Sequence, residues 1–164
     1  MVTTSCETLL TEIAKPKQRL SIIVKSDPFL CYWSEQILLN NWYNDCPKQR
    51  LRIQDNSAAN NIEQHLLQVD LLQSKKTWII NCNKPGLCKD SKLDTVILKC
   101  LAQTANQILI IFENINAGHQ RGSWFKKLAA NGLIITTKAL SNYKVPLWLT
   151  QYSKHIAAPI AKPL

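Results

Sequence analysis

The chain has 164 residues, a formal net charge of +9, 46% hydrophobic residues and 19% charged residues. This length suits one domain with a substantial core, and this composition excludes a disordered chain. No apolar run approaches the roughly 18–20 residues of a membrane span, so we expect no membrane partner. The first residues carry Glu7 and Glu12 and no basic stretch, unlike a signal peptide, and we expect a cytoplasmic protein.

The first predicted elements are a helix, a strand and a second helix. Apolar residues at helical spacing from Cys6 to Ile13 predict a helix that ends near Pro16. The run at residues 19–24 is apolar and rich in β-branched side chains, which predicts a buried strand. Asp27 followed by Pro28 is typical of an N-cap and the first residue of a helix.

The rest of the chain alternates between short strands and helices. Further strands are predicted at residues 51–54, 77–82, 107–112 and 133–137. Between the first two of these, a helix with an inward stripe of Ile62, Leu66 and Val69 is predicted, and a last helix runs from 146 to about 155. Ser91 and Asp94 are spaced as in a variant capping box, and Gly132 is placed as a C′ glycine that ends a helix.

Five strands with intervening helices predict an α/β fold, with a five-stranded parallel sheet and helices on both faces. Many such sheets bind nucleotide at the turn after the first strand. In this chain that turn, residues 25–29, has no glycine. Pro28 lacks an N–H group, and Asp27 would repel phosphate. We therefore expect a degenerate nucleotide site and no cofactor.

The residue types that perform catalysis or bind metals are not gathered in a recognisable motif. His65, His119 and His155 lie on separate predicted elements, without a nucleophile or zinc motif around them. Glu113 follows the central strand, where hydrolytic NTPases place acidic residues, but it has no phosphate loop to act with. The six cysteines contain no CxxC pair, so we expect buried or free thiols and no metal site. These patterns favour a binding module without intrinsic catalysis.

The most informative segment is Gln68-Val69-Asp70-Leu71-Leu72, at the end of a predicted helix. It resembles the peptide that bacterial proteins insert into the pocket of the ring-shaped DNA sliding clamp. Two neighbouring leucines at a helix end can fill an apolar pocket, while Gln68 and Asp70 supply hydrogen bonds that fix the orientation. The alternative is that Leu71 and Leu72 belong to the core of the domain itself.

Motifs spread along nearly the whole chain resemble the N-terminal domain of the delta subunit of bacterial DNA polymerase III, a clamp-loader subunit. Residues 20–30 resemble the first strand and degenerate phosphate loop of the family, with Ser26 in place of its usual glycine. Residues 71–77 resemble the stretch before its third strand. Residues 123–128 resemble its Ala-Trp-Phe-x-x-Leu helix, and 145–148 its Leu-Pro-x-Trp helix start.

This resemblance implies an AAA+ or P-loop NTPase-like domain at residues 2–140 that binds the clamp, followed by the start of a helical lid domain or a linker at 141–164. It implies that Val69, Leu71 and Leu72 enter the clamp pocket, with Gln73, Lys75 and Lys76 as supporting contacts. The implied partners are the sliding clamp (the beta subunit), primed DNA and, in a full-length protein, the other clamp-loader subunits. Family members continue through a lid and a collar domain and act within a DNA polymerase holoenzyme, a nucleotidyltransferase.

Two alternatives stay open. The excess of positive charge would also suit a basic DNA-binding module on an α/β fold. An ATP-binding clamp-loader subunit of the same fold is opposed by the missing phosphate loop.

Overall fold

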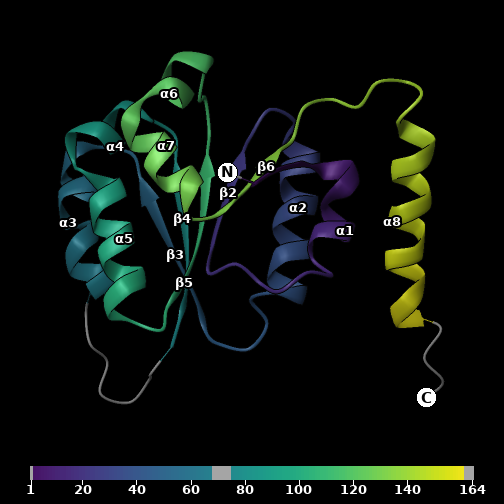
Figure 1. Ribbon diagram of the computed structural model, residues 1–164, viewed down its shortest axis with the longest axis horizontal. Coiled ribbons are helices and arrows are strands. Elements are labelled where there is room, and N and C mark those ends of the chain that lie inside the picture. Colours follow the sequence, from purple (N-terminus) through teal and green to yellow (C-terminus); the bar gives the residue numbers. More distant parts are fainter. Residues whose placement is uncertain (1, 68–74, 161–164) are drawn as a thin grey trace.

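The computed structural model describes residues 2–67 and 75–160, which form a six-stranded parallel sheet between two layers of helices (Figure 1). The strand order is β1-β6-β2-β5-β4-β3, and every neighbouring pair is parallel. The strands are β1 (Val2–Ser5), β2 (Leu20–Val24), β3 (Lys48–Ile53), β4 (Thr77–Cys82), β5 (Gln107–Phe112) and β6 (Leu133–Thr136). The α/β class and the parallel sheet are confirmed, but the predicted count of five strands was wrong.

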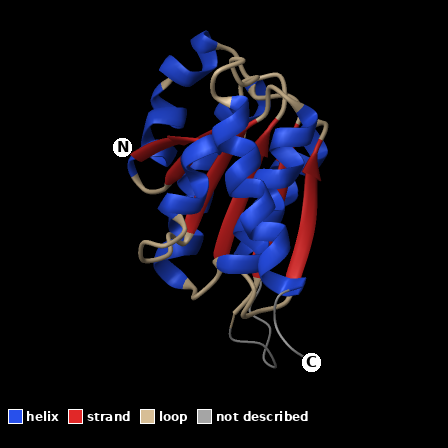
Figure 2. Cartoon of the chain, turned by 90° about the vertical axis from the view of Figure 1, so that its right-hand side faces the viewer, coloured by secondary structure: helices blue, strands red, loops and turns tan. Residues whose placement is uncertain are grey.

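Helices cover both faces of the sheet, as predicted (Figure 2). The helices are α1 (Leu9–Glu12), α2 (Pro28–Asn41), α3 (Asn56–Leu67), α4 (Gly86–Asp90), α5 (Leu93–Gln103), α6 (Ala117–Arg121), α7 (Ser123–Ala130) and α8 (Val145–Ile160), with a 3₁₀ turn at Cys6–Thr8. In Figure 1, α3, α4, α5 and α7 lie on one face, and α1, α2 and α8 lie on the other. No helix in the described part of the chain is long and apolar enough to cross a membrane.

The missed strand is β1, which adds to the sheet beside β6. Val2 pairs with Leu133, and Ser5 pairs with Thr136. The four residues of β1 are too short and too polar to show a strand pattern, and they become a strand because β6 offers them a free edge. The segment predicted as one helix from Cys6 to Ile13 forms the 3₁₀ turn and then the four residues of α1, whose C-cap is Ile13.

Alternating side chains of the central strands build two separate cores. Ile22 of β2 and Ile110 of β5 face the layer of α3, α5 and α7, whereas Ile23 and Ile111 face the layer of α1, α2 and α8. Both β2 and β5 are buried along their whole length. This explains why these strands are apolar apart from Ser21 and Gln107, since a parallel sheet covered on both sides offers no polar face.

The last helix packs back onto α2 through aromatic side chains. The Trp148 ring lies edge-on to Trp33 with 5.6 Å between ring centroids, and it stacks on Tyr152 at 5.0 Å. Just before α8, Lys144 Nζ lies 2.8 Å from Glu7 Oε1. Residues from the predicted lid or linker segment 141–164 therefore contact the first predicted domain.

The helix ends follow the sequence signals only in part. Asp27 caps α2 as predicted, because its Oδ1 accepts the backbone N–H of Leu30 at 2.8 Å, and Pro28 is the first helical residue. The prediction of a capping box at Ser91 was wrong. Ser91 Oγ instead donates to the carbonyl of Leu87 at 2.7 Å, and Lys92 precedes α5 in the left-handed region with φ of 54°.

Gly132 occupies the predicted C′ position, directly after Asn131, the C-cap of α7, but the reason for a glycine there differs from the predicted one. No glycine in the described residues has a positive φ, so Gly132 does not end α7 in the left-handed conformation. It lies where β6 starts beside β2, and a Cβ atom on Gly132 would lie 2.6 Å from the carbonyl oxygen of Leu20. The position needs glycine because the backbones of two strands approach closely there.

We therefore expect Gly132→Ala to lower the free energy of unfolding by about 1–3 kcal/mol through overpacking against β2. Gly86→Ala is the matched control, because a Cβ on Gly86 meets nothing within 4 Å. Urea unfolding of both variants measures the difference. Equal stability of the two variants would contradict the role assigned to Gly132.

Candidate functional site

The predicted clamp-contact residues Gln68, Val69, Asp70, Leu71, Leu72 and Gln73 all lie outside the described residues. The chain enters this segment from the end of α3 at Leu67 and leaves it toward the start of β4 at Thr77. Parallel strands all begin at one edge of the sheet, which we call the amino edge, and Lys75 and Lys76 lie at this edge because they directly precede β4. Within α3, the predicted inward residues Ile62 and Leu66 are buried in the core.

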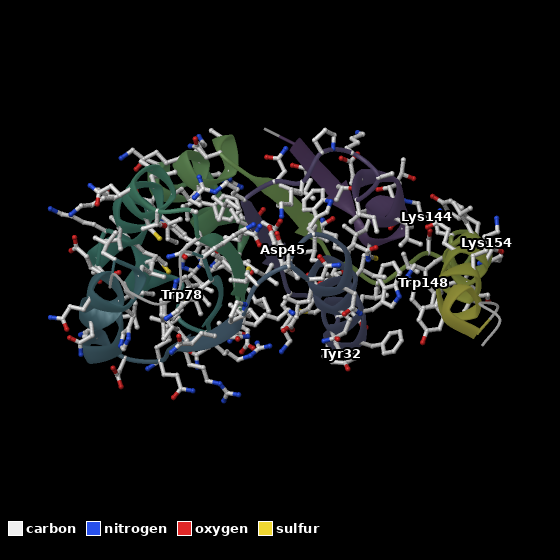
Figure 3. All side chains as sticks on the ribbon, turned by 90° about the horizontal axis from the view of Figure 1, so that it is seen from below. Tyr32, Asp45, Trp78, Lys144, Trp148 and Lys154 are labelled. Carbon is white, nitrogen blue, oxygen red and sulfur yellow. The ribbon has the colours of Figure 1, made fainter. Side chains whose placement is uncertain are left out.

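Lys75 follows the segment and is tied to the body of the domain by an acidic residue that the sequence did not single out. Asp45, labelled in Figure 3, lies in the connection between α2 and β3. Its Oδ2 is 2.7 Å from Lys75 Nζ and 2.9 Å from Lys17 Nζ. In the amide orientation that satisfies every partner, the buried Gln107 also accepts from both ammonium groups, at 3.1 and 2.9 Å, and donates to Thr77 Oγ1. The ion pair is therefore built on the start of a central strand.

The backbone beside Lys75 is held as well. The N–H of Lys76 donates to Asn106 Oδ1 at 2.8 Å, and its carbonyl accepts from Gln107 at 2.9 Å. The Lys76 ammonium lies 5.8 Å from the centre of the Trp78 ring, a cation–π distance. The predicted supporting residues Lys75 and Lys76 thus form a fixed base from which the segment departs.

Two ammonium groups around one carboxylate shift the titration of this cluster. Hydrogen bonds from Lys75 and then from Lys17 hold the pKa of Asp45 well below its ordinary value of 3.8, and the bond to Asp45 raises the pKa of Lys75. Since Asp45 is largely exposed, solvent screening reduces the free energy that this shift represents.

The opposite, carboxyl edge of the sheet carries the turn where related folds bind phosphate. Here the backbone N–H groups of the turn are already bonded within the protein. Lys25 N–H donates to the carbonyl of Phe112 at 3.0 Å, Ser26 N–H to Thr137 Oγ1 at 2.9 Å, and Asp27 N–H to the carbonyl of Thr137 at 3.0 Å. These are the N–H groups that a phosphate-binding turn presents to its ligand.

Thr137 is the residue that sequence reasoning missed at this edge. It is fully buried, and its Oγ1 both accepts from Ser26 and donates to the carbonyl of Val24 at 2.9 Å. A threonine at the end of a predicted strand carries no signal of this role, because the role exists only when β6 lies beside β2.

The crevice between β2 and β5 is the topological switch point of the sheet, since β2 leads to α2 on one face and β5 leads toward α7 on the other. Lys25 and Glu113 meet there, with 3.3 Å between Nζ and Oε1. Glu113 directly follows the central strand β5, as predicted. Its negative charge is balanced by Lys25, which lies in the turn after β2.

The other candidate groups are not brought together. His65 lies on α3, and His119 lies on α6, where its Nδ1 accepts from the backbone of Asn116 at 3.3 Å. No cluster of three or more His, Cys, Asp or Glu with metal-binding geometry occurs among the residues that the structure describes. All six cysteines are free and five are buried, as expected for thiols, with Cys82 Sγ and Cys88 Sγ 3.2 Å apart.

The chain matches no protein-family model, and no curated protein is significantly similar to it.

We expect Thr137→Val to destabilise the domain by about 1–3 kcal/mol, because valine keeps the shape but leaves the Ser26 N–H without its acceptor. Thr136→Val is the control, since Thr136 Oγ1 makes only a 3.4 Å hydrogen bond to Thr4. Thermal unfolding of both variants decides, and an unchanged Tm for Thr137→Val would contradict the role of this hydroxyl.

The ion pairs of Asp45 predict a pH dependence. A carboxylate whose folded-state pKa is depressed adds stability that is present above its unfolded pKa and is lost as pH falls through the folded one. Asp45→Asn removes this contribution, so its free energy of unfolding should fall less steeply than that of the wild type from about pH 5 downward. If the free energy of unfolding fell equally steeply with pH in both proteins, the stabilising role of the Asp45 ion pairs would be contradicted.

Proposed function

We propose that this chain is the clamp-binding domain of a bacterial clamp-loader delta subunit, which binds and opens a DNA sliding clamp for loading onto primed DNA without using nucleotide itself. The observation that carries the proposal is the Gln-Val-Asp-Leu-Leu segment at residues 68–72, placed between α3 and β4. Segments of this type dock adjacent apolar side chains into a pocket and orient them by polar neighbours.

Aromatic residues of the other motifs that resemble the family are buried and pack against neighbouring elements of the fold. Trp124 and Phe125 are buried and pack against Phe112 at the end of β5, with ring centroids 5.5 and 6.0 Å away. Trp148 joins α8 to α2. The spacing of these motifs is therefore tied to a specific packing of helices on a parallel sheet, which supports a family relation over a chance match of one short peptide.

The carboxyl edge supports the part of the proposal that excludes nucleotide use. An AAA+ or P-loop NTPase-like domain would receive phosphates at the turn after β2. Thr137 and Phe112 accept the N–H groups of that turn, and the Asp27 carboxylate lies at the start of α2. This geometry favours a binding subunit of the nucleotide-type fold over an ATP-binding one.

The burial of two leucines does not supply enough free energy for a micromolar complex with the clamp. Burying Leu71 and Leu72 contributes about 3–6 kcal/mol, whereas a micromolar complex needs about 8 kcal/mol. The remainder must come from neighbouring residues, with Gln68, Gln73 and Lys76 the nearest candidates. Lys75 would contribute only by sharing its ammonium with Asp45, which already binds it.

Opening a ring requires that the domain bind the open clamp more tightly than the closed one. A firmly attached segment favours this differential affinity, because a loosely attached segment could bind the open and the closed clamp equally well. The bonds from Lys75 to Asp45 and from Lys76 to Asn106 supply such an attachment on the side of β4.

The test is titration calorimetry of the chain against the purified sliding clamp of the same organism, without nucleotide. We expect micromolar or tighter binding, and a loss of about 100-fold or more in affinity for the Leu71→Ala/Leu72→Ala double variant. Leu147→Ala/Leu149→Ala is the matched control, because these two leucines of α8 are 54% and 47% exposed and should not affect the clamp.

Circular dichroism of each variant checks that the fold is retained. A folded wild-type chain that does not bind the clamp would refute the proposed function. Clamp binding that the double variant retains in full would place the contact outside residues 68–72.

A further inference from the structure

The outer edge of the sheet carries a row of basic side chains. Lys48, Arg50 and Arg52 alternate along β3, so they lie on one face of the strand, about 6.6 Å apart. Arg50 is opposite Ile79, which belongs to the core under α2, so this face is the one that α1, α2 and α8 cover elsewhere. All three basic residues are exposed, because α2 lies over the centre of the sheet and leaves β3 uncovered.

The middle residue of the row is fixed and the outer two are not neutralised. Arg50 forms an ion pair with Glu35 of α2 and donates to Asn81 Oδ1 at 2.6 Å. Among the described residues, the structure gives Lys48 and Arg52 no ion-pair partner. The row therefore keeps an excess of two positive charges on a rigid strand.

A polar hollow of about 150 Å³ adjoins the row at the carboxyl edge of the sheet. Arg50 and Arg52 line it together with Gln54, Asn81, Asn83 and Glu113. The three amides supply hydrogen-bond donors and acceptors that a charged row alone lacks. Glu113 is paired with Lys25, so its charge does not offset that of the row.

An exposed aromatic ring completes the surface. Tyr32 is 61% exposed and lies one helical turn before Glu35, the residue that binds Arg50. Because α2 runs opposite to β3, this turn brings Tyr32 toward the level of Arg52. Figure 3 shows Tyr32 on the outside of α2, and Trp33 turns instead toward α8.

We propose that this surface, formed by Lys48, Arg50, Arg52 and Tyr32, binds single-stranded nucleic acid. Cationic side chains at regular spacing along a strand fit successive phosphates of an extended chain, and an exposed aromatic ring offers a base a stacking platform. The proposal goes beyond the proposed function and does not depend on it.

The test is fluorescence anisotropy of the full chain with a labelled oligothymidylate, over a series of salt concentrations. The two cations of the row that are unpaired within the described part of the chain, Lys48 and Arg52, predict that log K falls against log salt with a slope of about −1.4, since single strands contribute about −0.7 per contact. The Lys48→Glu/Arg52→Glu variant should bind at least tenfold more weakly, and its slope should fall toward zero.

Lys89→Glu/Lys126→Glu is the matched control. It makes the same change in net charge at two exposed lysines of α4 and α7, on the other face of the sheet, and we expect nearly wild-type binding. An equal loss of binding in the two double variants would overturn the proposal, because it would show that net charge alone attracts the oligonucleotide.

Variants of Tyr32 distinguish a nucleic-acid site from a site that binds any polyanion. Tyr32→Ala should weaken oligothymidylate binding about fivefold or more, whereas Tyr32→Phe should retain it, because phenylalanine keeps the stacking face. Poly-glutamate, used as a competitor of matched charge, should displace the oligonucleotide poorly. Equal binding of poly-glutamate, or of a DNA duplex of the same length, would overturn the assignment to a single strand.

Discussion

The handedness of the strand connections governs where each feature of this domain lies. The chain moves from β2 outward to β3 through α2 on one face, then returns through α3, α5 and α7 on the other face until it crosses β2 and reaches β6. Because strand–helix–strand crossovers are right-handed, the helices change face whenever the chain reverses the direction in which it adds strands across the sheet. One consequence is a switch point between β2 and β5. Another is that, among the helices of the described residues, α2 alone reaches toward the β3 edge on its face of the sheet.

The two ends of the parallel strands have acquired different chemistry. At the carboxyl edge, Thr137 and Phe112 satisfy the turn after β2, and the Lys25–Glu113 pair occupies the crevice that related folds use for ligands. At the amino edge, Asp45 and Gln107 hold the lysine that follows residues 68–74. The first edge stabilises the domain internally, and the second fixes Lys75 and Lys76, which directly precede β4.

Sequence patterns were most reliable where one local rule and the tertiary structure agree. Asp27-Pro28 predicted the start of α2, and the apolar runs of β2 and β5 predicted buried central strands. They failed where the partner was distant in the chain. Val2–Ser5 is a strand only beside β6, and β3 begins at Lys48, three residues earlier than predicted, because its pairing with β4 stabilises polar residues. Gly132 was assigned to a helix end, although the backbone of β2 explains it.

By itself, the sequence determined the α/β class, the central strands and the absence of a glycine-rich phosphate loop. Each of these is encoded in neighbouring residues, through periodicity or a short motif. The tertiary structure decided that Thr137 closes the turn after β2, that Asp45 holds Lys75, and that Lys48, Arg50 and Arg52 remain exposed in a row. These features join residues up to 111 positions apart, and only the packing of strands and helices brings such residues within hydrogen-bonding distance.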